Sequence, residues 1–448
     1  MPMKKRANWG SRMGFILATV GSAVGLGNVW RFPTVVAENG GGAFVLLYLL
    51  MVLLIGLPTM VGELTLGRAG NRNVVGVFSQ LTTRMHKWWL IGILPILASF
   101  AVLSFYTVVA GWSLLYVFSS LAGITADLGT TELEKLFNFL TGNVYFPILG
   151  QFVFMALTVS IVIIGVRKGI ERYVTFLMPA VVLLMLILFA RTLFLEGAWE
   201  GIGWFFRPEL QQLSFNTALE AVGQVFFSFS LGMGAIIIYG SYLGKDSNIP
   251  MNSILISGAD VGVALLSGLI VIPSLFAFGI SPETGPGLIF VTLPAIFNTF
   301  PGSILWTTIF FLLLTFAALT SAVSLLEVIV SYLKEERKWS RSISALFVGG
   351  LIFVVSIFAG LSQGTYEEIA LAGMNFFNFL DFTASNILLP LGGLCIVLFI
   401  GWVWGTQQAS AEITRENRSF KWAAAWSILI RYLVPISIGY ILISGLLF

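Results

Sequence analysis

The sequence predicts an all-α polytopic membrane protein in which two membrane helices are broken near their midpoints. Three observations lead to this fold class. Of the 448 residues, 57% are hydrophobic and 10% are charged, and the mean hydropathy is +0.94. The apolar residues form runs of about 20 residues or more, the length of a helix that crosses a bilayer. Glycine clusters interrupt the first and sixth of these runs, where a continuous helix would otherwise be expected.

The apolar runs predict eleven membrane spans in a single transmembrane domain covering residues 1–448. They lie at about 10–36, 41–67, 88–121, 146–165, 170–192, 215–242, 254–279, 302–334, 342–361, 372–404 and 424–447. We expect two five-helix repeats, at about 9–192 and 215–404, and an extra helix at about 424–447. Five is an odd number, so the two repeats would cross the membrane in opposite directions.

The distribution of charge predicts the orientation. Twenty of the 24 Lys and Arg residues fall in connections on one side, which the positive-inside rule assigns to the cytoplasm together with the N-terminus. Eleven spans then place the C-terminus outside the cell. Single cysteine and histidine residues, Cys395 and His86, exclude an intrachain disulfide and a His-based metal site. The lipid bilayer is the expected surrounding, and we expect no nucleic-acid partner and no obligate protein partner.

The first break is the stretch from Gly21 to Asn28, with the sequence GSAVGLGN. In hydrocarbon, irregular backbone is tolerated only where it lines a protein cavity. A helix-packing surface is the alternative, because Gly21 and Gly25 form a small-xxx-small pattern. Asn28 and Arg31 favour a binding site, since polar groups inside a membrane segment usually face a cavity. Unwound carbonyls could bind a cation, and exposed amides could bind an anion.

The second break runs from Ser228 to Gly234 and combines two serines with two glycines. Thr320 and Ser321 add adjacent hydroxyls in the eighth span, although such hydroxyls often only bond back to the preceding turn. Oxygen ligands without a carboxylate cluster suit Na⁺ better than a divalent ion. Two broken helices at corresponding positions predict the substrate and ion site of a transporter.

Four acidic residues within apolar runs, Glu63, Asp260, Glu327 and Asp381, are candidates for a functional role. Glu63 and Glu327 have a simpler interpretation as hydrogen-bonded structural anchors, which we favour for Glu327. Asp260 lies deep in its run and is the strongest candidate for an ion ligand. Asp381 and Arg31 both lie near the expected outer boundary, where an ion pair between them could close a vestibule.

Gly169, at the start of the fifth span, is separated by nine residues from Pro179 within it. Proline lacks an N–H group, so Pro179 deprives the Thr175 carbonyl of its helical partner. This end of the helix could therefore unwind, although kinks at proline are common in membrane helices.

Several motifs together resemble the neurotransmitter:sodium symporter family, and most closely its bacterial amino-acid branch. They are Asn8-Trp9-Gly10-Ser11-Arg12, the run from Gly21 to Pro33, the run from Glu38 to Phe44, Gly62-Glu63 with Gly67-Arg68, and the run from Gly223 to Ser228. The resemblance implies a LeuT-like five-plus-five inverted repeat plus one helix, in a bacterial inner (cell) membrane. It also implies sodium-coupled symport of hydrophobic L-amino acids, aliphatic and aromatic, such as leucine and tryptophan, into the cell by alternating access.

The resemblance further implies two sodium ions as cofactors. The first would be held by the substrate carboxylate with Ala23, Asn28, Ser228 and Asp260. The second would be held by Gly21, Val24, Ala317, Thr320 and Ser321.

A substrate pocket and two gates follow from the same resemblance. The pocket residues are Ala23, Gly25, Leu26, Gly27, Val102, Phe105, Tyr106, Phe227, Ser228, Ser230, Met233, Ser321 and Leu325. The gate residues are Arg31 with Asp381 on the outside, and Arg6 with Glu335, Trp9 and Tyr242 on the inside. Gly169 and Pro179 match a motif for unwinding of helix 5.

Three positions refine these expectations. Gly25 stands where carriers of biogenic amines have an aspartate, so the substrate should bring its own carboxylate. Met233 replaces a rigid aromatic residue, and methionine adapts to several side-chain shapes. Chloride-independent relatives carry a glutamate at the position of Ala264, and here Asp260 is expected to supply that negative charge instead.

Two other classes of function were weighed against a symporter. A channel fits sealed gates and broken helices less well than alternating access does. An integral membrane enzyme is not expected, because the sequence contains no HExxH, GxSxG or Walker motif.

Overall fold

A computed structural model of the chain describes residues 8–82, 87–279, 287–364, 366, 368–415 and 419–447. Regular structure in this part is helical except for one short antiparallel ribbon. In that ribbon β1 (Ala370–Leu371) pairs with β2 (Met374–Asn375), with Ala370 opposite Asn375. Helices dominate because, in hydrocarbon, each span must satisfy its own backbone polar groups.

The helical elements include several π-helical or 3₁₀ turns, labelled η. In the first half they are α1 (Arg12–Ala23), η1 (Gly27–Arg31), α2 (Phe32–Glu38), α3 (Gly42–Met51), η2 (Val52–Gly56), α4 (Leu57–Gly70), α5 (Val74–Leu81), η3 (Trp88–Gly92), α6 (Ile93–Leu121), α7 (Thr130–Gly142), α8 (Tyr145–Ile164), η4 (Val166–Glu171), α9 (Arg172–Thr192), α10 (Ala198–Phe206) and η5 (Leu210–Gln212). In the second half they are α11 (Phe215–Ser228), α12 (Ala235–Gly240), α13 (Ile249–Ala277), η6 (Leu288–Thr292), α14 (Leu293–Asn298), α15 (Ser303–Glu336), α16 (Arg341–Leu361), α17 (Phe376–Phe382), η7 (Thr383–Leu388), α18 (Leu389–Leu398), η8 (Phe399–Gly405), α19 (Thr406–Ile413), α20 (Ala423–Ile428), η10 (Leu429–Leu433) and α21 (Val434–Leu447).

The described residues contain nine helices that are long and apolar enough to cross a membrane. A tenth span is α1 together with η1 and α2, which are bent by 53° at the predicted first break. The predicted sixth span is interrupted more completely, since α11 and α12 are separated by residues 229–234. The chain is therefore a multi-pass membrane protein with two broken helices, as the sequence predicts.

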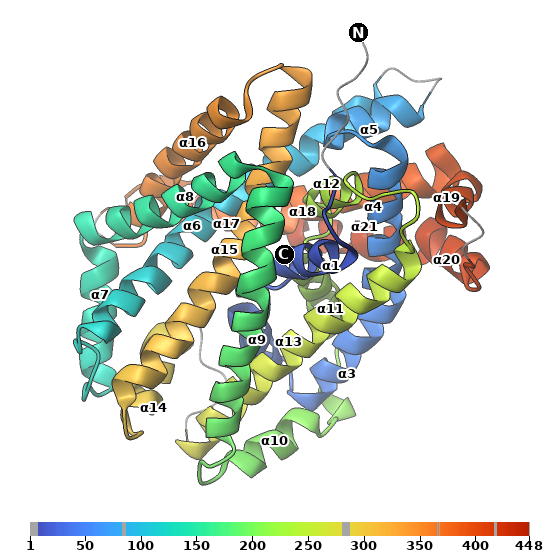
Figure 1. The fold of residues 1–448 in the computed structure, drawn as a ribbon. Helices are drawn as coiled ribbons and strands as arrows, with labels where there is room; N and C mark the ends of the chain where they lie inside the picture. The colour runs from blue at the N-terminus through green and yellow to red at the C-terminus, as the bar shows by residue number, and fades with distance from the viewer. Residues whose placement is uncertain are drawn as a thin grey trace.

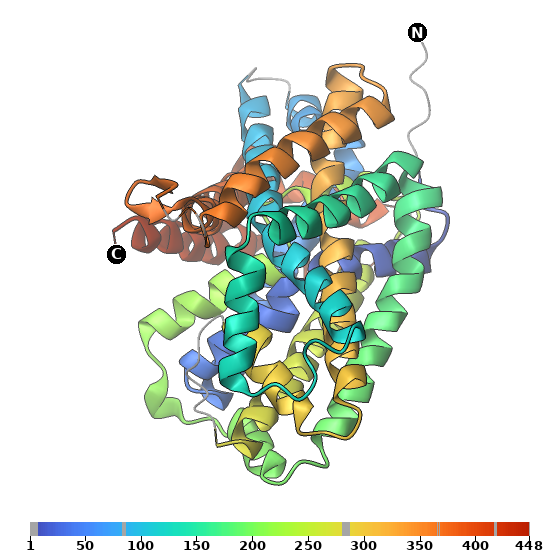
Figure 2. The same ribbon diagram turned by 90° about the vertical axis from the view of Figure 1, so that its left-hand side faces the viewer.

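The two broken helices lie in the middle of the molecule, enclosed by long continuous helices (Figures 1 and 2). The first half-helix, α1, packs against α9, α13 and α15, while α12 packs against α4 and α15. The short helices α7, α10 and α14 lie at one end of the molecule, and α5 and the turn between α15 and α16 lie at the other (Figure 1). The scaffold thus holds irregular backbone away from lipid.

Polar side chains start several helices. Ser11 and Ser214 accept hydrogen bonds from the backbone of the first turns of α1 and α11, and Asn248 does the same for α13. The span predicted at about 372–404 continues to Ile413. The helix is longer than predicted because α19 extends it with polar residues. Hydropathy marks only the part of a helix that lipid contacts.

The fifth span does not show the predicted unwinding in this conformation. Gly169 lies in the π-helical turn η4, where its N–H donates to the Gly165 carbonyl. The helix α9 then continues through Pro179 without a break. Opening of this segment stays a prediction.

Candidate functional site

The two breaks face each other at the centre of the protein. Val24, after the last residue of α1, has extended backbone, and Ser230, Gly232 and Gly234 all have positive φ in the second break. Ser230, at φ 52°, is the one residue of these three with a Cβ, and its hydroxyl donates to the Ser22 carbonyl at 2.8 Å. This bond across the two breaks offsets the backbone strain at Ser230.

The predicted ligands of the first sodium ion come together as a buried oxygen-rich cluster. Asn28 Nδ2 donates to Ser228 Oγ and to Asp260 Oδ1, both at 2.9 Å. Ser228 Oγ donates to Asp260 Oδ2 at 2.6 Å, and all three side chains are fully buried. No basic side chain of the described residues pairs with Asp260. An isolated buried carboxylate is costly, so this cluster is suited to a bound cation.

The predicted second sodium site joins α1 to α15. Ser321 Oγ lies 3.3 Å from the Gly21 carbonyl oxygen and 3.2 Å from that of Val24. It also lies 3.2 Å from the carbonyl oxygen of Ser22, which the sequence analysis did not include. Thr320 Oγ1 donates instead to the Ala317 carbonyl. Its hydroxyl therefore bonds back to the preceding turn of its own helix, which is the alternative to an ion ligand. These are hard oxygen ligands, and the described residues hold no cluster of three or more His, Cys, Asp or Glu that could bind a metal.

Gly25 has no room for a side chain. A Cβ atom at this position would lie 2.5 Å from Ser321 Oγ and 2.7 Å from the Tyr106 hydroxyl. The Tyr106 hydroxyl also accepts a hydrogen bond from Leu26 N at 3.1 Å. A Cβ at Gly27 would in turn lie 2.7 Å from the Phe227 ring. The first break is therefore bare backbone packed against polar and aromatic side chains.

A cavity of about 590 Å³ reaches this backbone from the side on which Arg31 and Asp381 lie. It is lined by four predicted pocket residues, Leu26, Phe105, Tyr106 and Phe227, and by both predicted outer-gate residues. Val102, Met233 and Leu325 are buried and do not line the cavity. The predicted pocket is thus open toward one face of the protein in this conformation.

Comparison with known proteins agrees with this geometry. The profile of the Sodium:neurotransmitter symporter family matches residues 6–141 and 139–447. The chain belongs to this family. An uncharacterized sodium-dependent transporter, YhdH of Bacillus subtilis, is 39% identical over 439 residues, covering 98% of this chain and 97% of the relative. A second uncharacterized sodium-dependent transporter, from Haemophilus influenzae, is 32% identical and covers 99% of both chains.

A solved structure shows the same fold. The crystal structure of MhsT in complex with L-phenylalanine is 42% identical, with a TM-score of 0.91, and the match covers 98% of this chain and 100% of MhsT. The predicted LeuT-like fold and the family are therefore confirmed, and the protein is a sodium-dependent symporter rather than an enzyme.

The predicted outer ion pair of this symporter is not formed in the structure. Arg31 Nη2 lies 3.9 Å from Glu220 Oε2, and its guanidinium lies 5.0 Å from the Phe227 ring centroid. Asp381 instead accepts a hydrogen bond from the Ser385 hydroxyl at 2.9 Å. Arg31 and Asp381 line the same cavity without pairing, because the cavity between them is open.

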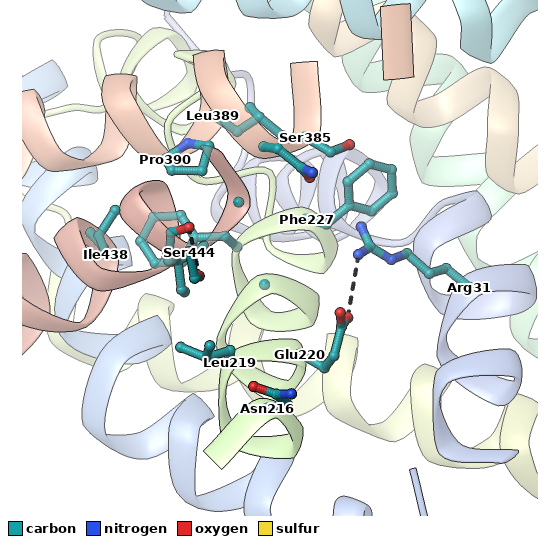
Figure 3. Close-up of a pocket in the computed structure, with 15 residues that line it drawn as sticks. Arg31, Asn216, Leu219, Glu220, Phe227, Ser385, Leu389, Pro390, Ile438 and Ser444 are labelled. Atoms are coloured by element: carbon teal, nitrogen blue, oxygen red, sulfur yellow. Dashed lines mark hydrogen bonds and ion pairs between the residues drawn. The ribbon is translucent and has the colours of Figure 1, made fainter. Parts of the chain in front are cut away.

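Glu220 was missed by the sequence analysis, although a signal was present. It is an acidic residue within the sixth apolar run, the criterion that singled out Asp260. Figure 3 shows Glu220 and Arg31 at the edge of a second cavity of about 480 Å³, which α11, α18 and α21 enclose. Glu220, and not Asp381, is thus the carboxylate that Arg31 approaches in this conformation.

Two residues of the predicted inner gate, Trp9 and Tyr242, are in contact. Trp9 Nε1 donates to the Tyr239 carbonyl at 3.1 Å, and the Trp9 ring meets the Tyr242 ring edge-on, with centroids 6.1 Å apart. Tyr242 donates to Glu327, which also forms a buried ion pair with Arg341 and so serves as the predicted structural anchor.

Glu335, the predicted inner-gate acid, accepts hydrogen bonds from both the backbone N and Nδ2 of Asn73. Its predicted partner Arg6 lies outside the described residues.

Glu171 is a second acid that sequence reasoning missed. Its carboxylate accepts hydrogen bonds from Gly10 N at 2.7 Å, Ser11 N at 3.0 Å and Ser11 Oγ at 3.1 Å. A Cβ at Gly14 would lie 2.0 Å from Glu171 Oε1, so the glycine makes room for the acid. A carboxylate at the start of a helix satisfies free N–H groups there. Glu171 thereby ties the fifth span to the start of α1.

Proposed function

We propose that this symporter carries hydrophobic L-amino acids into the cell together with two sodium ions, by alternating access. The observation that carries the proposal is the packing of Gly25. The tight contacts with Ser321 and Tyr106 leave no space for an acidic side chain that could replace a substrate carboxylate. The substrate must then bring its own carboxylate, as L-phenylalanine does in the MhsT complex.

The substrate carboxylate is proposed to bind at the bare backbone of the first break. The Leu26 N–H donates to the Tyr106 hydroxyl in this conformation, so the hydroxyl's own proton and the N–H groups near Gly27 are the donors proposed for the carboxylate. The substrate ammonium would meet the carbonyls of Ala23, Phe227 and Ser230. Donors held in place before binding cost little to organise.

Coupling to sodium follows from the position of that carboxylate. Asn28, Ser228 and Asp260 lie next to the break, so the carboxylate would complete the first sodium site together with the Ala23 carbonyl. Each ligand would then strengthen the binding of the other by the same factor. The second ion would bind between Gly21, Val24, Ala317, Thr320 and Ser321. Since Asp260 has no basic partner in the described part of the chain, we propose that it supplies the negative charge and makes transport independent of chloride.

The side-chain part of the pocket is apolar. Val102, Phe105, Phe227, Met233 and Leu325 are proposed to surround the substrate side chain, and four of these five are buried. Methionine adapts its shape readily, so aliphatic and aromatic amino acids should both bind. Leucine and tryptophan are the test substrates of choice.

The gates define the proposed cycle. The cavity beside Arg31 and the contacts of Trp9 support an assignment of this conformation to a state open on the side of Arg31 and closed on the side of Trp9. Closing would transfer Arg31 from Glu220 to Asp381, and inward opening would separate Arg6 from Glu335 and unwind the segment from Gly169 to Pro179.

From the positive-inside rule we propose that the N-terminus lies in the cytoplasm of a bacterial cell and that, with eleven spans, the C-terminus lies outside. We further propose that residues 9–192 and 215–404 form two inverted repeats.

Uptake into proteoliposomes tests this function. Radiolabelled leucine should accumulate above its external concentration when an inward sodium gradient is applied, and replacing chloride with gluconate should leave the rate unchanged. A channel would instead pass current without concentrating the substrate. Accumulation that is independent of sodium would overturn the proposal, and a loss of uptake in gluconate would overturn the chloride part of it.

A further inference from the structure

Three neighbouring basic residues form a patch at the turn between α8 and α9. Arg167, Lys168 and Arg172 are all exposed, and together with Ile164 and Tyr173 they line a shallow hollow of about 680 Å³. The turn lies on the face that the charge pattern predicts to be cytoplasmic, in the upper half of Figure 1. The patch takes no part in the proposed transport mechanism.

Four other basic residues on the same face are paired within the protein. Arg68, Arg72, Arg341 and Arg415 each form an ion pair with a glutamate of the protein. Within the described ranges, no carboxylate pairs with Arg167, Lys168 or Arg172. Arg167 does lie near one carboxylate, since a Cβ at Gly10 would be 2.7 Å from Arg167 Nε and 3.1 Å from Glu171 Oε1. Three adjacent cations with one nearby carboxylate keep a net positive charge and attract an anion.

The one acidic residue within this turn is directed elsewhere. Glu171 lies directly before Arg172 in the sequence, but its carboxylate is buried and occupied by Gly10 and Ser11 of the first span. The Glu171 carboxylate thus serves the start of α1 and lies beside Arg167, whereas the described residues offer no carboxylate to the exposed side chains of Lys168 and Arg172. An external anion is the partner that this arrangement lacks.

The surroundings of the patch identify the kind of anion. Ile164, Tyr173 and Phe176 are exposed apolar residues next to the three cations, with Phe176 71% exposed. Exposed apolar side chains on a membrane helix contact acyl chains, and tyrosine is enriched at the level of the headgroups. A ligand that meets both surfaces has a phosphate group and an attached hydrocarbon tail.

We propose that the hollow lined by Arg167, Lys168 and Arg172 binds the headgroup of an anionic phospholipid of the cytoplasmic leaflet. Clusters of Lys and Arg next to a membrane helix attract anionic lipids, with a gain of about fivefold in binding per cation. The phosphate lies among the three side chains, and the acyl chains lie along the exposed face of α9.

The proposal is tested by titrating the purified protein in detergent with dioleoyl phosphatidylglycerol and following thermal stability. Dioleoyl phosphatidylcholine and soluble glycerol phosphate serve as the zwitterionic and tail-free comparisons. Phosphatidylglycerol alone should stabilise the wild type. Its apparent affinity should fall about a hundredfold in the triple variant Arg167→Gln/Lys168→Gln/Arg172→Gln.

A matched control removes the same charge elsewhere on the predicted cytoplasmic face. Lys334→Gln/Arg337→Gln/Lys421→Gln alters three exposed cations outside the hollow and should bind the lipid like the wild type. Equal stabilisation of the site variant and the wild type would overturn the proposal, as would equal stabilisation by glycerol phosphate. If the triple variant does not fold, the three single variants replace it. Each should lose about fivefold in affinity, and wild-type affinity in all three would refute the site.

Discussion

The backbone N–H of Leu26 donates a 3.1 Å hydrogen bond to the hydroxyl of Tyr106. This contact joins the break in the first membrane helix to the middle of α6, a helix of the surrounding scaffold. The same hydroxyl would lie 2.7 Å from any Cβ at Gly25. One phenol therefore orients the unwound backbone, excludes a side chain from it and remains available to a substrate carboxylate.

Replacing Tyr106 with phenylalanine removes that hydroxyl and keeps the ring. Hydrogen bonds to charged groups contribute about 1.5–3 kcal/mol, so leucine affinity in sodium should fall about tenfold or more. Equilibrium binding of radiolabelled leucine measures the effect. Unchanged affinity in Tyr106→Phe would exclude a role for this hydroxyl in binding the carboxylate.

Substituting Gly25 with alanine should also weaken leucine binding by about tenfold or more, because a Cβ does not fit between Ser321 and Tyr106. Gly258→Ala is the matched control, since a Cβ at Gly258 meets nothing within 4 Å. Binding should be normal in the control. A Gly25→Ala protein that binds leucine as tightly as the wild type would show that the break has spare room.

Asp260→Asn removes the one acidic side chain of the first sodium cluster while keeping its shape. The sodium concentration that half-saturates leucine binding should rise about tenfold, because a charged ligand to the ion becomes neutral. A sodium titration at fixed leucine concentration gives this value. If the titration curve of Asp260→Asn overlays that of the wild type, Asp260 is not a ligand of the ion. The same titration with Ser321→Ala probes the second sodium site.

Glu220→Gln should shift the outer gate toward closure, because Arg31 loses its present partner and becomes free to pair with Asp381. Pairs this exposed are worth at most about 1 kcal/mol, so the shift should be fivefold or less. The closure of the gate is measured by the alkylation rate of a cysteine that replaces Thr34, a residue lining the cavity, in a Cys395→Ala background. Closure should make this rate slower. The difference in alkylation rate between Glu220→Gln and the parent protein should shrink at high potassium chloride, because salt screens exposed charges. Faster alkylation in Glu220→Gln would contradict the competition between Glu220 and Asp381.

Glu171→Ala should loosen the start of α1, since the carboxylate accepts three hydrogen bonds from Gly10 and Ser11. Backbone amides at the start of α1 should then exchange hydrogen faster, by about tenfold. Hydrogen–deuterium exchange with mass spectrometry reports this directly, and Glu200→Ala on the exposed surface of α10 is the control. Unchanged exchange in Glu171→Ala would mean that the clamp does not hold the helix.

Much of the fold was predictable because membrane spans are long, apolar and locally encoded. The breaks at 21–28 and 228–234 were predictable for the same reason, since glycine and serine are poor residues for a lipid-buried helix. The contacts of Glu171 and Glu220 were not predictable, because their partners lie more than 150 residues away in sequence. The pairing of Arg31 with Glu220 and the wound state of the fifth span depend on conformation, which one sequence does not specify.

Equilibrium binding of leucine and tryptophan, with sodium and with choline in its place, tests the central claim most directly. We predict saturable binding of both amino acids in sodium and an affinity about 5- to 150-fold weaker in choline, as expected for a coupling free energy of about 1–3 kcal/mol. Equal affinity in the two salts, or no binding of either amino acid in sodium, would contradict the account.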